Sequence, residues 1–441
     1  MPTELAAMRR TLIIAGILLL IIGAGLAYFY FFEKPRGIAV VPQGAVNFPT
    51  AGQREPTAGG GASTASTQTA APEAVSSRLT RISGGPVVPG EAVVDIPAKN
   101  ASPVGDQISN GASSSPSSTS LGVNDVAVSY IERQSGNVYV YVKSAGTVAR
   151  KTNKTLPGIQ SALWVPDGST AFVRYLSGAD FSSVSTYALP VDNGLSADRQ
   201  GFFLPQNLAD IAIASSSPVG NPISNGASIL TLASGVNGSV ASLGKIDGSR
   251  TSDAFTTPLS ALRIAFAGKN QYLAFTKPTS SLPGYAFFVD KNGRFSRVAG
   301  PANGLVALPS PSGKHVLISY IQDGSMQLAL ITAATGETTT LPVATIADKC
   351  VWTADDSAVY CGIPVSPSAI YQYPDDWYQG AVAFSDRIWK IDVTDRFAQL
   401  VFDFSLETES ALDAQAMAIN PLGTMLVFVN KNDGSLWAYS L

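Results

Sequence analysis

Histidine is nearly absent, because His315 is the only one among the 441 residues. With a single imidazole, no histidine-based metal cluster and no histidine acid–base pair can form within one chain. A Ser-His-Asp site would also need a nucleophile elbow such as Gly-x-Ser-x-Gly, and the similar stretch Gly235 to Gly238 lacks the serine. His315 follows the turn at 311–313 and begins an apolar run, which favours a structural role. We predict no metal site, no cofactor and no catalytic constellation.

Charge is also scarce. Charged residues make up 14% of the chain, against about 25% in an average soluble protein. The net charge is -3, the pI is near 5.3 and no basic stripe is present to neutralise phosphates. These values argue against nucleic acid as a partner. A hydrophobic content of 45% over this length fits one large domain with a tail.

Cysteine occurs twice, at Cys350 and Cys361, which lie symmetrically about Asp355-Asp356. A two-residue hairpin there would place the two cysteines opposite each other, at a hydrogen-bonded pair of the ladder. A disulfide is one interpretation and implies an oxidising, extracytoplasmic setting. A pair of buried thiols is the other, since the bond depends on the strand spacing.

One long apolar run, Thr11 to Phe32, carries no charge and follows Arg9 and Arg10. It is long enough to cross the ~30 Å hydrocarbon layer as a helix. A cleaved signal peptide is the alternative, because Gly25-Leu26-Ala27 is typical of a cleavage site. The run exceeds the ~7 to 15 residues of a signal core and ends in an aromatic belt at 28–32. We predict a transmembrane helix at 11–32 behind a short cytoplasmic head at 1–10.

Residues 33–77 are rich in Gly, Ser, Thr, Ala and Pro, with almost no large apolar residues after Phe48. Such a segment cannot bury enough surface to offset the entropy of ordering it. We predict a flexible, disordered linker at 33–77 and one folded domain at 78–441. The protein would be a single-pass membrane protein with its C-terminal domain extracytoplasmic.

After Arg78 the sequence becomes a series of short runs rich in Val, Ile, Tyr, Phe and Thr, and no convincing amphipathic helix is present. Turn dipeptides that suit hairpins separate some of these runs. The runs include 138–142, 285–289, 316–320, 326–331 and 425–429, and the dipeptides are Asn292-Gly293, Asp323-Gly324 and Asp433-Gly434. The pattern predicts an all-β meander.

The meander repeats. A turn of the type x-Pro-x-Gly, or a degenerate form of it, follows an apolar run at seven places. The shorter spacings are close to the ~40 to 45 residues of a four-stranded propeller blade. The turns begin at Ser102, Val165, Ser217, Ala267, Ser310, Thr353 and Asn420. We therefore predict a seven-bladed β-propeller of four-stranded blades.

These residues carry a resemblance to the WD-repeat-like propellers of TolB type, whose blades place Ser-Pro-Asp-Gly between their first two strands. The resemblance spans 78–441, although only Val165 to Gly168 keeps the Pro-Asp-Gly core. It implies a scaffold for protein interactions at a bacterial cell envelope.

The ring can be closed by pairing the two ends of the domain. The last unit supplies three strands, at 414–419, 425–429 and 436–440. We predict that Leu79 to Ile82 forms the missing outer strand, since closure removes open edges. The first blade would continue at 92–96 and resume at Val126.

Two segments, 102–113 and 217–228, differ at only two positions, Asp106/Asn221 and Gln107/Pro222. Both are expected between the first and second strands of their blades, hence on one face of the disc. Duplication and a shared requirement of two loops explain the likeness equally well.

The insertion 364–385 in the sixth unit is the best candidate for binding. It joins the second and third strands, which places it on the face opposite the first turns. Exposed aromatic rings beside carboxylates make good anchors for a protein, glycan or peptide. The alternative is a loop that caps its blade with Trp377 buried. The candidate residues are Tyr371, Tyr373, Asp375, Asp376, Trp377 and Tyr378.

Paired carboxylates could still support glycosidase chemistry on a propeller. Asp355, Asp356 and Asp386 are candidates beside the acids of the insertion, but the sequence shows no geometry for them. Four tryptophans within strand-like runs are predicted to be core residues, namely Trp164, Trp352, Trp389 and Trp437.

The main prediction for function is a non-enzymatic, membrane-anchored scaffold that binds another envelope or surface protein, or a ligand. The first alternative is an extracytoplasmic hydrolase of glycans or peptides that uses carboxylates in the propeller channel. A purely structural spacer is the second.

Overall fold

The computed structural model describes residues 71–97, 124–153, 155–178, 180–191, 200–214, 228–249, 251–269 and 271–441. The predicted membrane helix, its cytoplasmic head, most of the linker and the turns at Ser102 and Ser217 lie outside these residues. Within the described ranges no helix is both long and apolar enough to cross a bilayer. Membrane attachment therefore stays a prediction.

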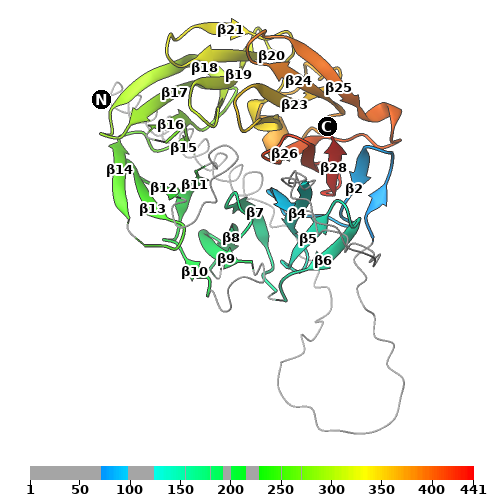
Figure 1. The fold of residues 1–441 in the computed structure, drawn as a ribbon. Coiled ribbons are helices and arrows are strands. Elements are labelled where there is room, and N and C mark those ends of the chain that lie inside the picture. The colour runs from blue at the N-terminus through cyan, green and yellow to red at the C-terminus, as the bar shows by residue number, and fades with distance from the viewer. Residues whose placement is uncertain are drawn as a thin grey trace, which may run out of the picture. The chain divides into compact units, whose positions relative to one another are not determined.

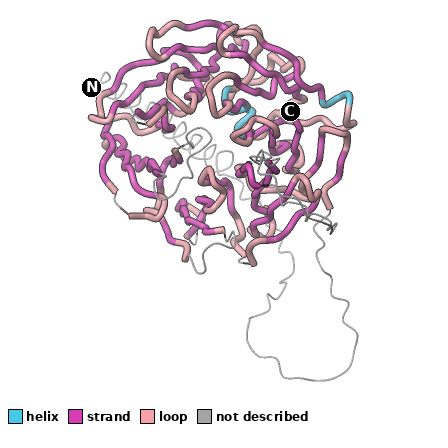
Figure 2. Tube along the Cα trace, in the orientation of Figure 1, coloured by secondary structure: helices cyan, strands magenta, loops and turns pink. Residues whose placement is uncertain are grey.

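The described chain is antiparallel β-sheet almost throughout, and its sheets lie around a ring with their first strands toward the middle (Figure 1). Loops and turns join the strands, and the few helical segments are short (Figure 2). This arrangement is that of a β-propeller.

Four of the sheets contain four strands each. The first holds β3 (Ala92–Pro97), β4 (Asn124–Ile131), β5 (Val138–Val142) and β6 (Thr147–Arg150). The second holds β7 (Ile159–Trp164), β8 (Thr170–Ser177), β9 (Ser183–Pro190) and β10 (Phe202–Phe203). The third holds β11 (Leu208–Ile213), β12 (Ser228–Gly235), β13 (Gly238–Lys245) and β14 (Ser252–Thr257). The fourth holds β22 (Cys350–Trp352), β23 (Ala358–Pro364), β24 (Asp386–Asp392) and β25 (Ala398–Asp403).

A seven-stranded sheet lies between the third and fourth of these along the chain. Its strands are β15 (Leu262–Phe266), β16 (Gln271–Thr276), β17 (Pro283–Asp290), β18 (Phe295–Pro309), β19 (His315–Gln322), β20 (Ser325–Thr332) and β21 (Thr338–Thr340). The long strand β18 pairs with β17 through its first part and with β19 through its second.

The last sheet contains both ends of the described chain and closes the ring. Its order is β1 (Glu73–Ala74), β2 (Leu79–Arg81), β28 (Leu436–Ser440), β27 (Met425–Asn430) and β26 (Ala414–Ile419). Leu79 lies opposite Tyr439, and Ile82 N donates to Leu436 O at 2.8 Å. The predicted closing strand is confirmed. Strand β1 shows that pairing begins within the stretch predicted as linker, because Ser76 supports a turn back onto β2.

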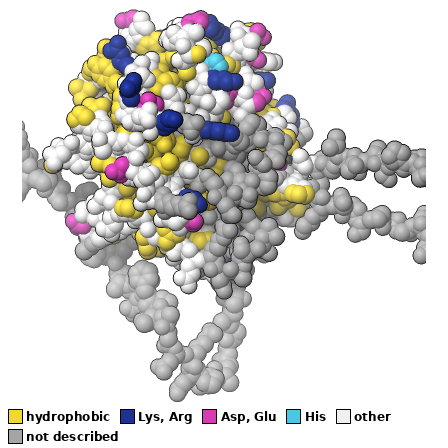
Figure 3. Space-filling model, turned by 60° about the vertical axis from the view of Figure 1, so that its left-hand side comes forward, with side chains coloured by type: hydrophobic (Ala, Val, Ile, Leu, Met, Phe, Trp, Pro, Cys, Tyr) yellow, Lys and Arg dark blue, Asp and Glu magenta, His cyan; other side chains and the backbone are white. Residues whose placement is uncertain are grey.

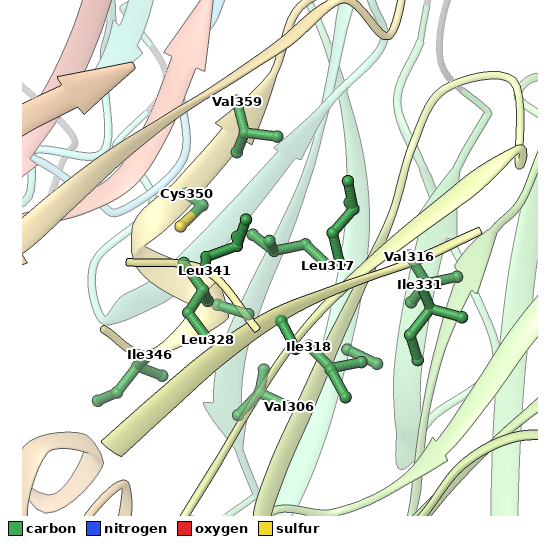
Figure 4. Close-up of a cluster of buried hydrophobic side chains, with 14 of the residues drawn as sticks. Val306, Val316, Leu317, Ile318, Leu328, Ile331, Leu341, Ile346, Cys350 and Val359 are labelled. Carbon is green, nitrogen blue, oxygen red and sulfur yellow. The ribbon is translucent and has the colours of Figure 1, made fainter. Parts of the chain in front are cut away.

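The apolar runs of the sequence form strands whose side chains are buried in the core. All six residues of β27 are buried, which fits an inner strand covered on both faces. A large core cluster fills the space between β18–β21 and β22–β23, with Leu317, Leu328 and Val359 fully buried (Figure 4). On the face seen in Figure 3, basic and acidic side chains are interspersed among hydrophobic ones, in keeping with the low charge content.

The repeated turn has the same backbone hydrogen bond after β7, β18, β22 and β26. Gly168 N donates to Val165 O at 2.8 Å, and Gly313 N donates to Ser310 O at 2.9 Å. Both glycines have a left-handed φ, 71° and 76°, which residues with a Cβ rarely adopt. Asp356 takes the same position in the turn after β22 with φ 63°. These turns place the ends of successive inner strands at one end of the ring.

Cys350 and Cys361 are joined by a disulfide between β22 and β23. Their Cα atoms are 4.1 Å apart, which matches the ~4.5 Å of a non-hydrogen-bonded pair better than the ~5.5 Å of the predicted hydrogen-bonded one. The difference comes from the turn, since Thr353 N donates to Ala358 O and encloses four residues instead of two. A longer turn shifts the alternation of the ladder by one position.

Candidate functional site

A cavity of about 250 Å³ lies where the inner strands end. Its walls come from β3, β7, β22 and β26 and from the turns that follow β7, β18, β22 and β26. These elements are distant in sequence and meet only because the ring closes. We call this cavity the channel mouth.

Two tryptophans form flat walls of the channel mouth. Trp164 Nε1 donates to Gly90 O at 3.0 Å, and Trp352 Nε1 donates to Leu308 O at 3.2 Å. Each indole is thus held by the backbone of a preceding inner segment, and its polar atom is satisfied. Both side chains are buried, as predicted, at 9% and 6% exposed, yet both also line the cavity.

Among the residues that the structure describes, Glu91 is the only ionisable one that lines the channel mouth. It is 8% exposed, and within the described residues neither of its carboxyl oxygens has a hydrogen-bond partner of ordinary geometry. Burial raises the pKa of Glu91 well above its usual value, and the Gly90 amide offsets only part of that rise. The side chain is therefore held in its protonated form over a wider pH range than a free glutamate.

Asp95 lies on β3, which begins directly after Glu91, and it makes structural hydrogen bonds. It accepts hydrogen bonds from Asn420 Nδ2 at 2.5 Å and from Leu422 N at 3.0 Å. These bonds connect β3 to the turn after β26. The four-residue separation puts Asp95 about 13 Å from Glu91 along an extended strand. That distance is too long for the ~5 to 9.5 Å of a glycosidase carboxylate pair.

The other acids named from the sequence also make structural contacts. Asp355 accepts from Ser357 within its own turn, and Asp356 accepts from Ser310 Oγ at 2.8 Å. Within the described ranges, no group of three or more His, Cys, Asp or Glu residues is placed to hold a metal ion.

The insertion 364–385 lies between β23 and β24, as predicted, and contains the short helix α2 (Asp375–Gln379). Trp377 and Tyr373 are each 4% exposed and pack around Phe384. Tyr371 is partly buried against the same core.

Asp375 and Tyr378 are bonded to residues outside the insertion, and Asp376 is bonded within it. Asp375 accepts from Ser280 N at 2.5 Å, and Asp376 accepts from Gln372 N at 2.7 Å. Tyr378 remains 39% exposed, but its hydroxyl donates to Asp348 at 2.7 Å. The loop therefore folds back onto the ring. Binding through these residues is not tested by this geometry and stays a prediction.

A buried ion cluster lies beneath the insertion. Lys349, at the end of the 3-10 turn η2 (Ala347–Lys349), places Nζ 2.7 Å from Asp386 Oδ2 and in direct contact with Asp413 Oδ1. All three side chains are fully buried. Nζ also donates to Ala414 O at 2.9 Å, and it lies over the rings of Trp377 and Phe384 at 5.1 and 5.2 Å.

The two carboxylates of the cluster have different surroundings. Asp413 Oδ2 accepts from Trp377 Nε1 at 3.0 Å and from Phe384 N at 2.9 Å. Asp386 Oδ2 accepts from Ala414 N at 2.7 Å, whereas its Oδ1 is buried without a partner. Burial raises the pKa of Asp386 to about 6, although the charge of Lys349 acts in the opposite direction.

The sequence interpretation did not single out Glu91, Lys349 or Asp413. A signal for Glu91 was present, because it is a lone acid in the apolar stretch 87–94. It also directly follows Gly90, whose carbonyl binds Trp164 as that of Leu308 binds Trp352. For Lys349 and Asp413 we find no local signal, since their partners lie 37 and 64 residues apart in sequence.

Comparison with known proteins gives a fold likeness only. No family model matches the chain, and no curated protein matches it. Among solved structures, an oligogalacturonate lyase in complex with manganese aligns at 10% identity and a TM-score of 0.46, covering 72% of this chain and 86% of that one. An oligogalacturonate lyase from Vibrio parahaemolyticus aligns at 8% identity and a TM-score of 0.45, with the same coverage.

These neighbours correct two of our predictions. They are enzymes, and this finding stands against a non-enzymatic scaffold and against the prediction that the protein has no catalytic activity. Both predictions are withdrawn. The WD-repeat-like resemblance in particular has no support from the comparisons, and the β-propeller fold rests on the sheets of the structure itself. At such low identity the likeness assigns no substrate to this chain.

Proposed function

We propose that the protein is an enzyme that cleaves glycan chains at the channel mouth, with Glu91 as the group that transfers the proton. The observation that carries the proposal is the buried carboxyl of Glu91, a residue that lines the channel mouth and whose carboxyl oxygens have no hydrogen-bond partner of ordinary geometry among the described residues. Structures rarely leave such a group without a partner unless a ligand or a reaction uses it.

The position of Glu91 suits general acid catalysis. A carboxylic acid that stays protonated toward neutral pH can give its proton to the oxygen of the leaving sugar. Burial favours the neutral form of Glu91, which is the form that donates a proton. Asp95 lies too far away to act as its partner. The described wall therefore supports proton transfer by one carboxyl better than hydrolysis by a carboxylate pair.

The tryptophan walls favour a sugar over a peptide. Two fixed, flat indole faces suit the apolar face of a pyranose ring, and one polar group among them can set its orientation. The volume of about 250 Å³ is near the lower limit of ligand pockets. We infer that it accepts about one ring, so that the enzyme acts at a chain end.

The wider architecture is part of the proposal. We infer that β18 serves as the last strand of one blade and the first of the next, which gives seven blades of TolB type. Support comes from its pairing with both β17 and β19. The apolar run at 11–32 would anchor the ring outside the cytoplasm, and the disulfide between Cys350 and Cys361 supports an oxidising compartment.

The test is cleavage of a panel of neutral and uronate oligosaccharides and of peptides by the full chain. Glu91→Gln keeps the shape and removes the acid, so we expect kcat to fall by about 10²- to 10⁴-fold. The matched control is Asp167→Asn, which alters an exposed carboxylate in the turn beside the cavity. Glu91→Gln turning over as fast as the wild type would show that the acid has no catalytic role. Cleavage of peptides alone would overturn the choice of glycans.

A further inference from the structure

The cluster of Lys349, Asp386 and Asp413 contains one buried carboxylate more than an ion pair with a single lysine requires. A buried lysine with one carboxylate would already be neutralised, and each additional buried charge costs free energy. Here one amine contacts two carboxylates at full burial, and the second carboxylate receives two further hydrogen bonds. The proposed cleavage at the channel mouth uses none of these groups.

Asp386 and Asp413 differ in their hydrogen bonds, and this difference suits them to different roles. Asp413 is oriented by Trp377 Nε1 and Phe384 N, so it can hold a negative charge and pass protons without moving. Asp386 is bonded through one oxygen only, and its Oδ1 is buried without a partner. The raised pKa of Asp386 agrees with this difference, because a protonated carboxyl is the form that an amine can attack.

We propose that Lys349 Nζ and Asp386 Cγ become joined by an isopeptide bond that the chain forms by itself, with Asp413 as the proton shuttle. Nζ lies 2.7 Å from Oδ2 of Asp386, and Cγ, the carbon that the amine would attack, is bonded to that oxygen. The separation of Nζ from Cγ is therefore close to the ~3 to 3.5 Å of a reacting pair. The structure thus holds the reactants in contact.

The reaction balances without any further reagent. Asp413 takes one proton from the Lys349 ammonium and passes it to the carboxylate of Asp386. The free amine then attacks Cγ, and the new N–C bond forms as the C–O bond to the protonated oxygen breaks. Asp413 moves the second proton from the nitrogen to that oxygen, which leaves as water. The ammonium and the carboxylate become an amide, Asp413 ends as a carboxylate, and no atom is oxidised or reduced.

The surroundings favour this condensation. The rings of Trp377 and Phe384 lie over Nζ at 5.1 and 5.2 Å and shield it from water. A site from which water is excluded strengthens each electrostatic contact and slows the reverse hydrolysis. The new bond would also replace a charged pair in the interior by a neutral amide.

The bond would give the fourth four-stranded sheet a second covalent link. Lys349 precedes Cys350, which is bonded to Cys361 on the neighbouring strand. Asp386 begins β24, the third strand of that sheet, so the two links would tie its first strand to the second and to the third. The insertion 364–385 would then be enclosed in a covalent loop.

Tryptic digestion of the reduced and alkylated full chain tests the proposal directly. The chain has no Lys or Arg from His315 to Asp348 or from Cys350 to Asp386. An unlinked protein gives peptides 315–349 and 350–387. The linked protein resists cleavage after Lys349 and gives one peptide, 315–387, about 18 Da lighter than its sequence through loss of water.

Variants of Asp386, Asp413 and Lys431 test the role of each residue in forming the link. Asp386→Ala should restore both separate peptides, and Asp413→Asn should slow or abolish formation of the link. Lys431→Gln is the matched control, because Lys431 packs on Trp377 at 5.2 Å but is not an amine partner of either acid, and it should leave the link intact. Recovery of 315–349 and 350–387 from the wild-type protein overturns the proposal whether or not any variant folds. Fragment ions that place the bond on Asp413 overturn the assignment of the two acids.

Discussion

At the scale of single residues, the buried acids Glu91 and Asp413 differ in their hydrogen-bond partners. Glu91 is surrounded by apolar walls and has no partner within the described residues, so burial favours its neutral form. Asp413 is equally hidden but receives a lysine, an indole N–H and a backbone N–H. Since an unpaired buried charge is costly, only the second arrangement compensates the burial of a carboxylate with charged and polar partners. The first suits an acid that gives up its proton for a short time.

The raised pKa of Glu91 predicts a dependence of stability on pH. Above the unfolded pKa of about 4.3 and up to the folded pKa, the native state binds more protons than the unfolded chain. The free energy of unfolding must therefore fall as the pH rises through this window. We expect urea denaturation between about pH 4 and pH 8 to show a smaller fall for Glu91→Gln than for the wild type. Parallel profiles of the two proteins would mean that Glu91 is not protonated by burial.

At the scale of elements, the insertion 364–385 has the composition of a binding loop, yet Trp377 and Tyr373 in it are buried against the ring. Its aromatic and acidic residues are those expected of an exposed anchor. The same residue types also fill a space above a blade, where Trp377 satisfies its indole N–H on Asp413. Composition cannot separate the two cases, because both need rings beside carboxylates. The burial of Trp377 and Tyr373 fits the cap, and binding through the insertion stays a prediction.

Removing the Trp377 ring should therefore destabilise the domain. We expect Trp377→Ala to lower the free energy of unfolding by about 3 to 5 kcal/mol, as for other large buried aromatic residues. Tyr378→Phe is the matched control in the same helix, since it removes one hydroxyl from a half-exposed ring. Its cost should be about 1 kcal/mol or less. Urea denaturation measures both. A Trp377→Ala protein of wild-type stability that no longer captured a partner would instead support an exposed anchor.

At the scale of the whole molecule, the ring depends on one long-range pairing. Strand β2 lies beside β28 although more than 350 residues separate Leu79 from Tyr439. Without it, the last sheet would keep an exposed edge next to the first. Open edges of this kind invite pairing with other chains.

A proline in the closing strand should open the ring. Thr80 pairs with Ala438, and Thr80→Pro removes a donor and restricts the backbone at the middle of β2. We expect a loss of about 2 to 3 kcal/mol in the free energy of unfolding, together with association on size-exclusion chromatography. Glu73→Pro, at the outer strand β1, is the control and should change little. Equal behaviour of the two variants would show that β2 does not close the ring.

The strands, the turns and the closing segment could be predicted because each depends on neighbouring residues. Alternating apolar positions determine which face of a strand is buried, and Asp323-Gly324 suits a hairpin in which both residues have a positive φ. Both residues have one in the structure, at 50° and 74°. The closing strand followed from the count of strands in the last unit. The cysteines lie opposite each other as predicted, but the type of their pair did not follow, since one more residue on each side of a turn exchanges hydrogen-bonded and non-hydrogen-bonded positions of the ladder.

The sequence by itself determined a chain of β-strands with recurring turns, because periodicity and turn chemistry act over a few residues. Only the tertiary structure decided what the chain could do chemically. Ring closure brings Glu91 to tryptophans of other sheets, and the packing of the fourth four-stranded sheet against the last sheet brings Lys349 to acids 37 and 64 residues away. Whether a carboxyl is a turn residue, a paired charge or a proton donor depends on its burial and partners, and these arise from contacts between distant segments.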